Sequence, residues 1–184
     1  MIRINEELYI RKLNETDVDD LFEIYSDKET VRYLLCDPWT AEHKDEEALK
    51  RIRLNEEEGS LGLGVICGEK LIGTLSVWKK EMKDTYEIGY VFHPEFRHRG
   101  YAFNALSKLI DYLFTETNAH RLYAVLDARN SDSVRLMERC GFVKEAYFRK
   151  DFFSKGEWTD TLIYAMLKED YAVRRECVNQ RRAS

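Results

Sequence analysis

The residues with the clearest potential for chemistry lie in one stretch, Val91-Phe92-His93-Pro94-Glu95-Phe96-Arg97-His98-Arg99-Gly100-Tyr101-Ala102. A strand pattern ends here, a short basic loop follows, and a long helix pattern begins at once. The first amides of a helix lack intrahelical acceptors and lie at the positive end of its dipole, so they attract anions. Gly100 lets the backbone approach an anion without a Cβ in the way, and Arg97 and Arg99 add positive charge. This stretch therefore predicts a phosphate-binding loop.

Two elements must position this loop. A strand near residues 85–93 carries Glu87 on one face and alternates it with aromatic and aliphatic residues on the other. A helix from Arg99 to about Glu116 repeats apolar residues at spacings of three and four. The remaining patterns predict a helix start near residue 16, helices over 41–57 and 131–139, and strands near 7–13, 61–67, 71–78, 121–126, 142–150 and 158–167. This order of elements indicates an α/β (α+β) domain with helices on the faces of a mixed sheet.

The length of 184 residues suits one domain over 1–184, with a core of about 7–170 and a basic C-terminal tail over 171–184. The tail contains Arg174, Arg175, Arg181 and Arg182. Because chain ends are usually loose, we expect a frayed and solvated tail, with a contact surface as the alternative.

Charge and composition argue against several classes of partner. The 29 Lys and Arg residues are outnumbered by 34 Asp and Glu residues, which gives a net charge of −5 and argues against nucleic acid as a partner. The sequence contains neither an apolar run long enough to span a membrane nor a signal-peptide pattern at its start. The four cysteines have long, irregular spacings, and the four histidines show no metal-ligand spacing. We therefore expect a cytoplasmic protein without a metal site or a membrane contact.

The loop resembles the R/Q-x-x-G-x-G/A pyrophosphate motif of the GNAT superfamily of acetyltransferases, which Arg97, Gly100 and Ala102 meet. The preceding Glu87-Ile88-Gly89-Tyr90 is similar to the family's strand, and Asn130, Ser133 and Gly141-Phe142 resemble its N-x-x-S…G-F segment. The resemblance covers about residues 7–170 and is closest to the branch that acetylates ribosomal-protein N-termini, with spermidine acetyltransferases a near second.

The resemblance implies a fold of about seven strands and four helices, in which the strand ending at Phe92 and the strand starting near Arg121 splay apart around the cofactor. It also implies acetyl-CoA as cosubstrate and acetyl transfer to a primary amine by direct attack in a ternary complex. The expected cofactor-binding residues are Val91, Phe92, His93, Arg97, His98, Arg99, Gly100, Tyr101, Ala102 and Asn130.

Catalysis on an amine requires the neutral form of that amine, so a base is expected. Glu87 is the first candidate, and its alternative role is a strand carboxylate that pairs with a neighbouring cation. Many family members place a Tyr seven residues after the Asn to protonate the leaving thiolate, but this chain has Met137 there. Ser133 is the remaining candidate acid, with a hydrogen bond at the helix start as its alternative role.

The acceptor is expected on the side of the first two helices. Residues 42–58 contain more acids than bases, and Glu46 and Glu47 would attract a cationic acceptor unless this is an ordinary solvated helix face. Tyr33 and Trp39 are candidates for the same groove. The acceptor is expected to be a protein N-terminal α-amine, with a small amine such as a polyamine as the alternative and a non-catalytic CoA-binding module as a third. A monomer and a homodimer are both compatible with the sequence.

Overall fold

The computed structural model describes the backbone of residues 1–183 and the side chains of residues 1–176. The chain divides into two compact units. The first contains Met1–Lys79 and Ile88–Lys108, and the second contains Lys80–Glu87 with the residues from Leu109 onward. Strand β5 (Thr85–Phe92) and helix α4 (Tyr101–Glu116) contribute residues to both.

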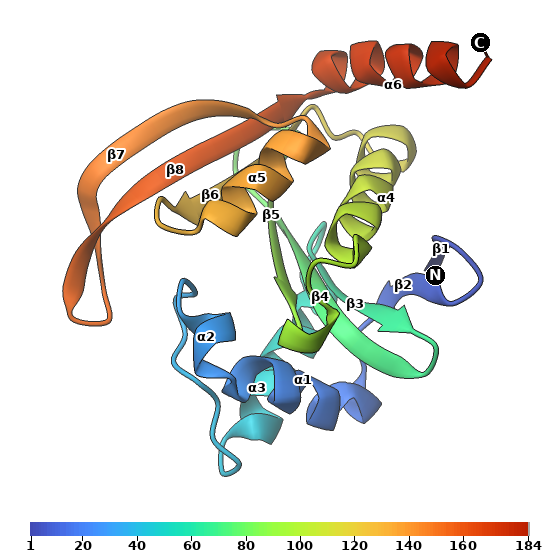
Figure 1. Cartoon of the computed structure of the whole chain (residues 1–184). Coiled ribbons are helices and arrows are strands. Elements are labelled where there is room, and N and C mark those ends of the chain that lie inside the picture. Colours follow the sequence, from blue (N-terminus) through green and yellow to red (C-terminus); the bar gives the residue numbers. More distant parts are fainter. Residues whose placement is uncertain (184) are drawn as a thin grey trace. The chain divides into compact units, whose positions relative to one another are not determined.

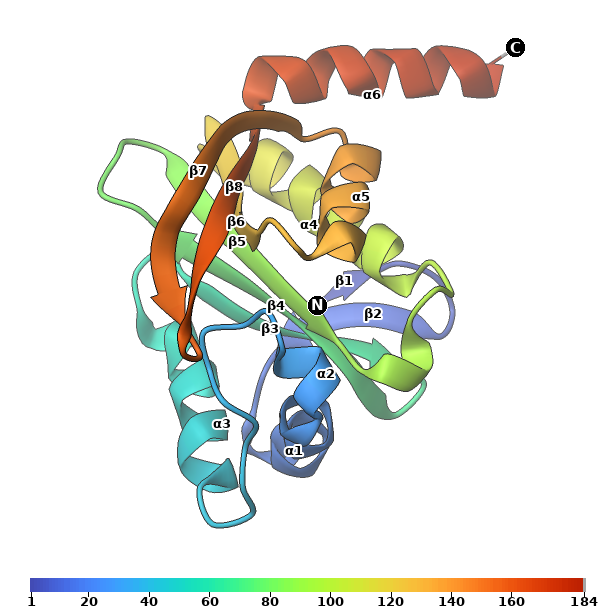
Figure 2. The ribbon, with the colours of Figure 1, turned by 60° about the vertical axis from the view of Figure 1, so that its left-hand side comes forward.

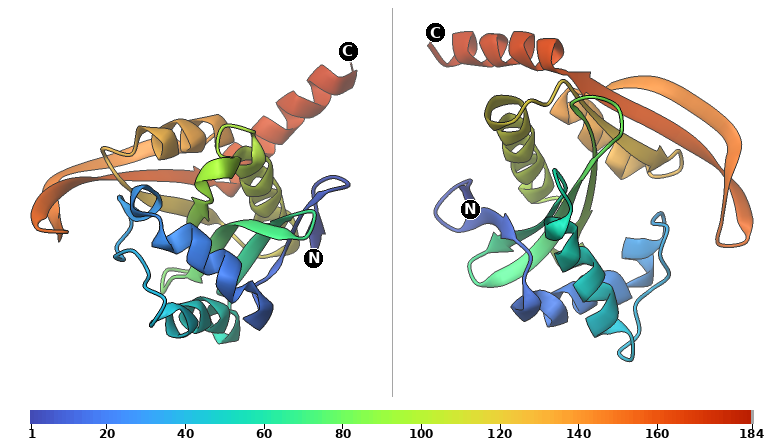
Figure 3. Two further views of the ribbon diagram at one scale, coloured as in Figure 1. Left: turned by 60° about the horizontal axis from the view of Figure 1, so that its bottom comes forward. Right: turned by 180° about the vertical axis from the view of Figure 1, so that it is seen from behind.

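The sheet of the first unit is antiparallel and follows chain order. Its strands are β1 (Ile2–Arg3), β2 (Leu8–Lys12), β3 (Leu61–Cys67) and β4 (Lys70–Lys79), which Figure 3 shows from two sides. The β3–β4 hairpin forms because Gly68 adopts a φ of +62°, a left-handed conformation that costs glycine little. Alternating burial along β2 and almost continuous burial along β4 match the hydrophobic patterns of these segments.

Three helices of the first unit lie close together in Figure 2, namely α1 (Val18–Ser26), α2 (Lys28–Val31) and α3 (Lys44–Arg53). A capping box at Asn14 and Asp17 starts the helical segment, because each side chain bonds the other's backbone amide. Apolar residues of α1 and the following segments form a buried cluster with the sheet, which includes Leu21, Tyr25 and Trp39.

The second unit combines parallel and antiparallel pairing. Its strand order is β5, β6 (Arg121–Asp127), β8 (Glu157–Leu167) and β7 (Val143–Ser154), and the long β7–β8 hairpin is visible in Figure 1. Among the described residues, the parallel β5–β6 ladder comprises three pairs and ends at Glu87–Tyr123. Both strands continue beyond that pair, β5 to Phe92 and β6 to Asp127. The expected divergence of the two strands beyond this pair stays a prediction.

Helix α5 (Ser131–Cys140) begins and ends at the residues whose types favour a helix start and a helix end. The Asn130 side chain accepts from the Ser133 amide at its start, and Gly141 ends it with a φ of +91°.

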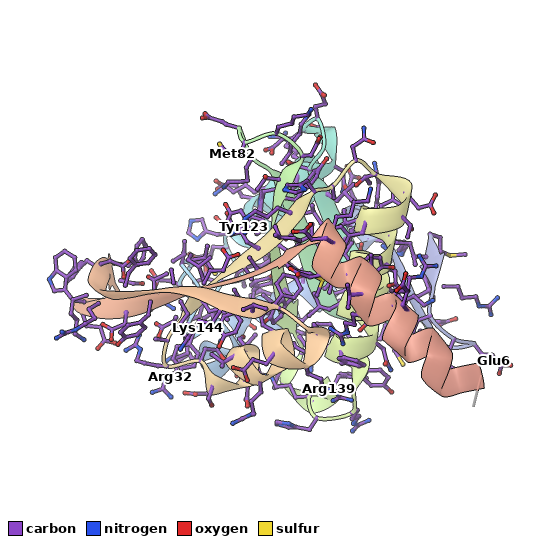
Figure 4. The ribbon with its side chains drawn as sticks, turned by 90° about the horizontal axis from the view of Figure 1, so that it is seen from above. Glu6, Arg32, Met82, Tyr123, Arg139 and Lys144 are labelled. Atoms are coloured by element: carbon purple, nitrogen blue, oxygen red, sulfur yellow. The ribbon has the colours of Figure 1, made fainter. Side chains whose placement is uncertain are left out.

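The C-terminal tail differs from the expectation of a frayed end. Residues Lys168–Ala183 form helix α6, and the aromatic ring of Tyr171 is buried and stacked on Phe114 at a centroid distance of 5.0 Å. The Arg174 guanidinium donates to the carbonyl of Arg139 at the end of α5, where the helix dipole favours a cation. Arg139 is labelled in Figure 4. Arg174 is therefore part of a docked helix, while the side chains of Arg181 and Arg182 lie outside the described residues.

The mixed α/β architecture is confirmed, with β1, α2 and α6 in addition to the predicted elements. β1 has two residues and α2 has four, and such short segments carry too few apolar positions for a periodic signal. Within the described residues, no helix is long and apolar enough to cross a membrane.

Candidate active site

The predicted phosphate loop has a backbone suited to an anion. Gly100 has a φ of +82°, and a Cβ added there would meet no heavy atom within 4 Å. His98 also adopts a positive φ, of +60°. The carbonyl of Gly100 accepts from the Asn104 amide, so the first turn of α4 starts immediately after the loop. Open space at Gly100 beside a helix N-terminus fits the pyrophosphate of CoA.

The side chains of this loop divide between the surface and the protein interior. His98 and Arg99 are exposed, and the Arg99 guanidinium lies 5.7 Å from the Phe96 ring centroid. Arg97 instead donates to the Thr30 hydroxyl at 2.7 Å. The buried His93 accepts from the Glu95 amide, so its ring caps the short 3-10 turn Pro94–Phe96. The exposed side chains of the loop are those of Pro94, Glu95, His98 and Arg99.

Glu87 is held by two partners within the second unit. Its carboxylate lies 2.9 Å from the Lys80 ammonium and accepts from the Tyr123 hydroxyl at 3.1 Å. Burial, followed by the negative charge of Glu87, raises the pKa of Tyr123, and the hydrogen bond to Glu87 raises the pKa of Lys80. Glu87, the expected base, therefore pairs with a neighbouring cation, as its alternative role describes. Its catalytic role stays a prediction.

The segment that follows β6 contains the other catalytic candidates. The Asn130 side-chain oxygen is engaged with the Ser133 amide at 3.1 Å, and Met137 is fully buried. The alternative helix-start role of this pair is thus present in the structure, and the cofactor role of Asn130 and the acid role of Ser133 stay predictions. In the same unit, the Tyr164 hydroxyl donates to the Glu138 carboxylate at 3.0 Å.

The acceptor-side residues have different environments within the first unit. Trp39 is 6% exposed and stacks on Tyr25 at 4.7 Å, so it belongs to the buried cluster. Tyr33 is half-buried, with the Arg32 guanidinium 5.3 Å from its ring centroid. Glu46 and Glu47 share one cation, because the Lys50 ammonium lies 2.9 Å and 2.6 Å from their carboxylates. The predicted roles of all four in acceptor binding stay predictions.

Three residues near the candidates were missed by the sequence argument, namely Thr30, Lys80 and Tyr123. Tyr123 meets Glu87 because the two are register partners in the parallel β5–β6 ladder, 36 residues apart in the chain. Thr30 meets Arg97 across 67 residues. No local spacing rule connects such positions, so only a prediction of strand register or helix packing would have found them.

Comparison with known proteins places the chain in a family. A family model described as an acetyltransferase (GNAT) domain matches residues 7–143. The chain is 31% identical over 166 residues to the uncharacterized N-acetyltransferase YnaD of Bacillus subtilis, which covers 89% of this chain and 95% of that protein. It is 27% identical over 176 residues to the spermidine N(1)-acetyltransferase of Vibrio cholerae, which covers 94% and 100%. The chain belongs to the GNAT acetyltransferase family.

A solved structure supports the same fold. The ribosomal L7/L12 α-N-protein acetyltransferase RimL, solved in complex with coenzyme A, matches with a TM-score of 0.82 and 19% identity over 90% of this chain and 97% of that one. The protein is an acetyl-CoA-dependent N-acetyltransferase that transfers an acetyl group to an amine. The alternative of a non-catalytic CoA-binding module finds no support among these relatives. The described residues contain no group of His, Cys, Asp or Glu arranged to hold a metal ion.

Proposed function

We propose that the acceptor is the N-terminal α-amine of a protein. The observation that carries this proposal is the state of Glu87, whose carboxylate is already engaged by Lys80 and Tyr123. Both contacts are made to the same carboxylate oxygen, so Glu87 already has a structural role as the partner of Lys80 and Tyr123. Such a site is best suited to an amine that needs little help from a base.

The two acceptor classes differ greatly in that need. A protein α-amine has a pKa of about 7.8, so roughly one molecule in seven is neutral near pH 7. An alkyl ammonium of the lysine type has a pKa of about 10.4, so roughly one in 2,500 is neutral. The α-amine therefore starts with an advantage of a few hundredfold in its reactive form, without any contribution from Glu87.

The charges of α3 support the same acceptor. Lys50 lies between Glu46 and Glu47, and Lys44 lies 2.5 Å from Asp19 of α1. These ion pairs reduce the field that the acidic residues would exert on a polycation, since a neutralised pair attracts a distant charge weakly. An acceptor that also offers backbone and side-chain groups depends less on that field.

The cofactor-binding part of the proposal assigns roles to the loop and to β5. Acetyl-CoA supplies the acetyl group as a reactive thioester. The backbone amides of Gly100, Tyr101 and Ala102 hold its pyrophosphate, with Arg99 adding positive charge and His98 a polar side chain at the surface. Backbone groups of Val91 and Phe92 orient the acyl-carrying arm, and an N–H there stabilises the developing oxyanion. Asn130 and Ser133, in the second unit, keep the roles that the family resemblance implies, with Asn130 binding the cofactor and Ser133 donating a proton to the leaving sulfur.

A small cationic amine is the second candidate. The 27% identity to a spermidine N(1)-acetyltransferase over the whole of that protein favours it. The excess of acids in residues 42–58 favours it as well, since seven Asp and Glu residues there outnumber four Lys and Arg residues.

A thiol-release assay with acetyl-CoA separates the two acceptors. The panel contains peptides with free N-termini, the same peptides with blocked N-termini and an internal Lys, and spermidine. We expect at least one free peptide to exceed spermidine about tenfold in kcat/KM near pH 7, with the blocked peptides inactive. If spermidine or the blocked peptides are turned over preferentially, the acceptor is an alkyl amine and not a protein α-amine.

A further inference from the structure

Arg97, the first residue of the pyrophosphate motif, uses its side chain for a contact away from the loop. Its guanidinium donates to the Thr30 hydroxyl at 2.7 Å, and both residues belong to the first unit. Thr30 lies on α2 and is 9% exposed. A charged hydrogen bond to a buried hydroxyl holds geometry more firmly than a surface contact, because little water competes for it.

Thr30 is also hydrogen-bonded to Asp27, the residue that caps the start of α2. Its amide and its hydroxyl both lie within donor distance of the Asp27 carboxylate, at 2.7 Å and 2.6 Å. A hydroxyl has one proton to donate, so with Asp27 as its acceptor it receives the Arg97 N–H on a lone pair. The hydrogen bond from Thr30, with a further contribution from the Arg97 charge, lowers the pKa of Asp27. The result is a directed chain from Arg97 through Thr30 to Asp27, which caps α2.

A second contact fixes the other end of the same loop. The Nδ1 atom of His93 accepts from the Glu95 amide, which places the ring proton of a neutral His93 on Nε2. Nε2 lies 3.6 Å from the Glu23 carboxylate of α1, which also pairs with Lys70 at 2.5 Å. The loop is thus hydrogen-bonded to α2 at Arg97, and at its other end His93 lies beside the Glu23 carboxylate of α1.

The helix that receives the Arg97 contact depends on its surroundings. A helix of four residues is too short to be stable by itself in water, so α2 relies on its cap and on the burial of Thr30 and Val31. Tyr33, the half-buried acceptor-side candidate, follows two residues after α2. Any change in the order of α2 therefore reaches the acceptor side of this unit.

We propose that Arg97 and Thr30 are positioning residues that couple occupancy of the cofactor loop to the order of α2. The proposal rests on the cofactor-loop assignment made above. Pyrophosphate bound at Gly100–Ala102 restrains the loop backbone, and a restrained Arg97 backbone keeps its guanidinium on Thr30. The acceptor side is then better formed when CoA is present, and by linkage an acceptor that requires ordered α2 strengthens CoA binding by the same factor.

Hydrogen–deuterium exchange with CoA as the only added ligand tests the coupling without an acceptor. The proteins compared are the wild type, Thr30→Val, which removes the hydroxyl, and Thr30→Ser, which retains it. In the wild type and in Thr30→Ser, we expect CoA to slow exchange at least threefold in peptides covering residues 27–35. In Thr30→Val this protection should be lost, while protection of residues 97–104 remains. Calorimetric titration with CoA verifies that each variant is loaded.

The outcomes separate the coupling from the assignment on which it rests. Protection of residues 97–104 without protection of 27–35 in the wild type overturns the coupling and leaves the cofactor loop intact. Absence of protection in both segments overturns the cofactor-loop assignment and the coupling together. Equal protection of 27–35 in Thr30→Val and the wild type shows that the hydroxyl carries no coupling. If Thr30→Val does not fold, Arg97→Lys takes its place, because a shorter, non-planar donor should weaken protection of 27–35 more than that of 97–104.

Discussion

Gly100 and Gly156 share a backbone conformation but not a predicted role. Their φ angles are +82° and +85°, and an added Cβ would meet no heavy atom within 4 Å at either position. Gly156 lies in the turn of the β7–β8 hairpin, and Gly100 lies at the start of α4. The cost of a side chain in a left-handed conformation is therefore similar at both, and any difference in ligand binding reports on the local site.

We expect Gly100→Asp to weaken CoA binding at least tenfold, or about 1.4 kcal/mol. The new carboxylate would occupy the open space beside the loop amides and repel the pyrophosphate. Gly156→Asp is the matched control and should bind CoA as the wild type does. Calorimetric titration of the folded variants measures both, and equal affinity of Gly100→Asp and Gly156→Asp would remove the phosphate-loop assignment.

Glu87 gives the second prediction at the scale of single residues. If it acts as the base, Glu87→Gln should lower kcat near pH 7 with little change in CoA affinity, and the loss should shrink toward the pKa of the amine. Glu145→Gln is the control, since Glu145 is another strand carboxylate of the second unit, paired with Arg121. Parallel pH–rate profiles for the wild type and Glu87→Gln would show that solvent or another group removes the proton.

At the scale of elements, helix α6 shows how a polar, charged segment becomes ordered. Tyr171 stacks on Phe114, and its hydroxyl donates to Asp111 at 2.9 Å. Gly141 also matters, because a Cβ there would lie 1.9 Å from the Arg174 side chain that reaches the end of α5. One buried aromatic and one cation at a helix end thus anchor a helix whose average residue is hydrophilic.

Tyr171→Ala should destabilise the docked helix by roughly 3 kcal/mol, because it removes a buried ring together with its hydrogen bond. Val173→Ala is the control on the same helix, since Val173 is 64% exposed and its truncation should change stability by less than about 0.5 kcal/mol. Urea denaturation gives both values. Similar free energies of unfolding for the two variants would mean that the Tyr171 contacts do not hold α6.

At the scale of the whole molecule, the net charge of −5 and the acidic excess around α3 raise the question of long-range recruitment. The pairing of Lys50 with Glu46 and Glu47 argues that much of this charge is used locally. Attraction by a field and recognition by fitted contacts respond differently to salt, since screening acts over about 10 Å at 0.1 M ionic strength.

For a peptide acceptor, we expect kcat/KM to fall less than about threefold between low and high salt, and Glu46→Gln with Glu47→Gln to have a similarly small effect. Spermidine, if it is accepted, should lose more than about tenfold under the same change because nearly all its binding groups are charged. The KM for acetyl-CoA in the double variant serves as the control and should stay constant. A steep salt dependence for the peptide would instead indicate that the acidic residues of the segment 42–58 recruit the acceptor by long-range attraction.

Features that depend on neighbours in the chain could be predicted from the residue order alone. The loop before α4, the length of that helix, the Asn130 cap and the left-handed Gly141 all follow from local residue types and spacings. The mixed sheet followed from the order of those elements.

The contacts between side chains that are distant in the chain could not be predicted in this way. In the folded chain Arg97 donates to Thr30, and Glu87 contacts Lys80 and Tyr123. Trp39 packs against Tyr25 in the buried cluster. Helix α6 packs through the Tyr171 ring, which stacks on Phe114 although most of its neighbours in the helix are charged or polar. These outcomes depend on strand register and on which faces pack together. Hydrophobic periodicity identifies the face that is buried, but it carries no information about which residue lies opposite.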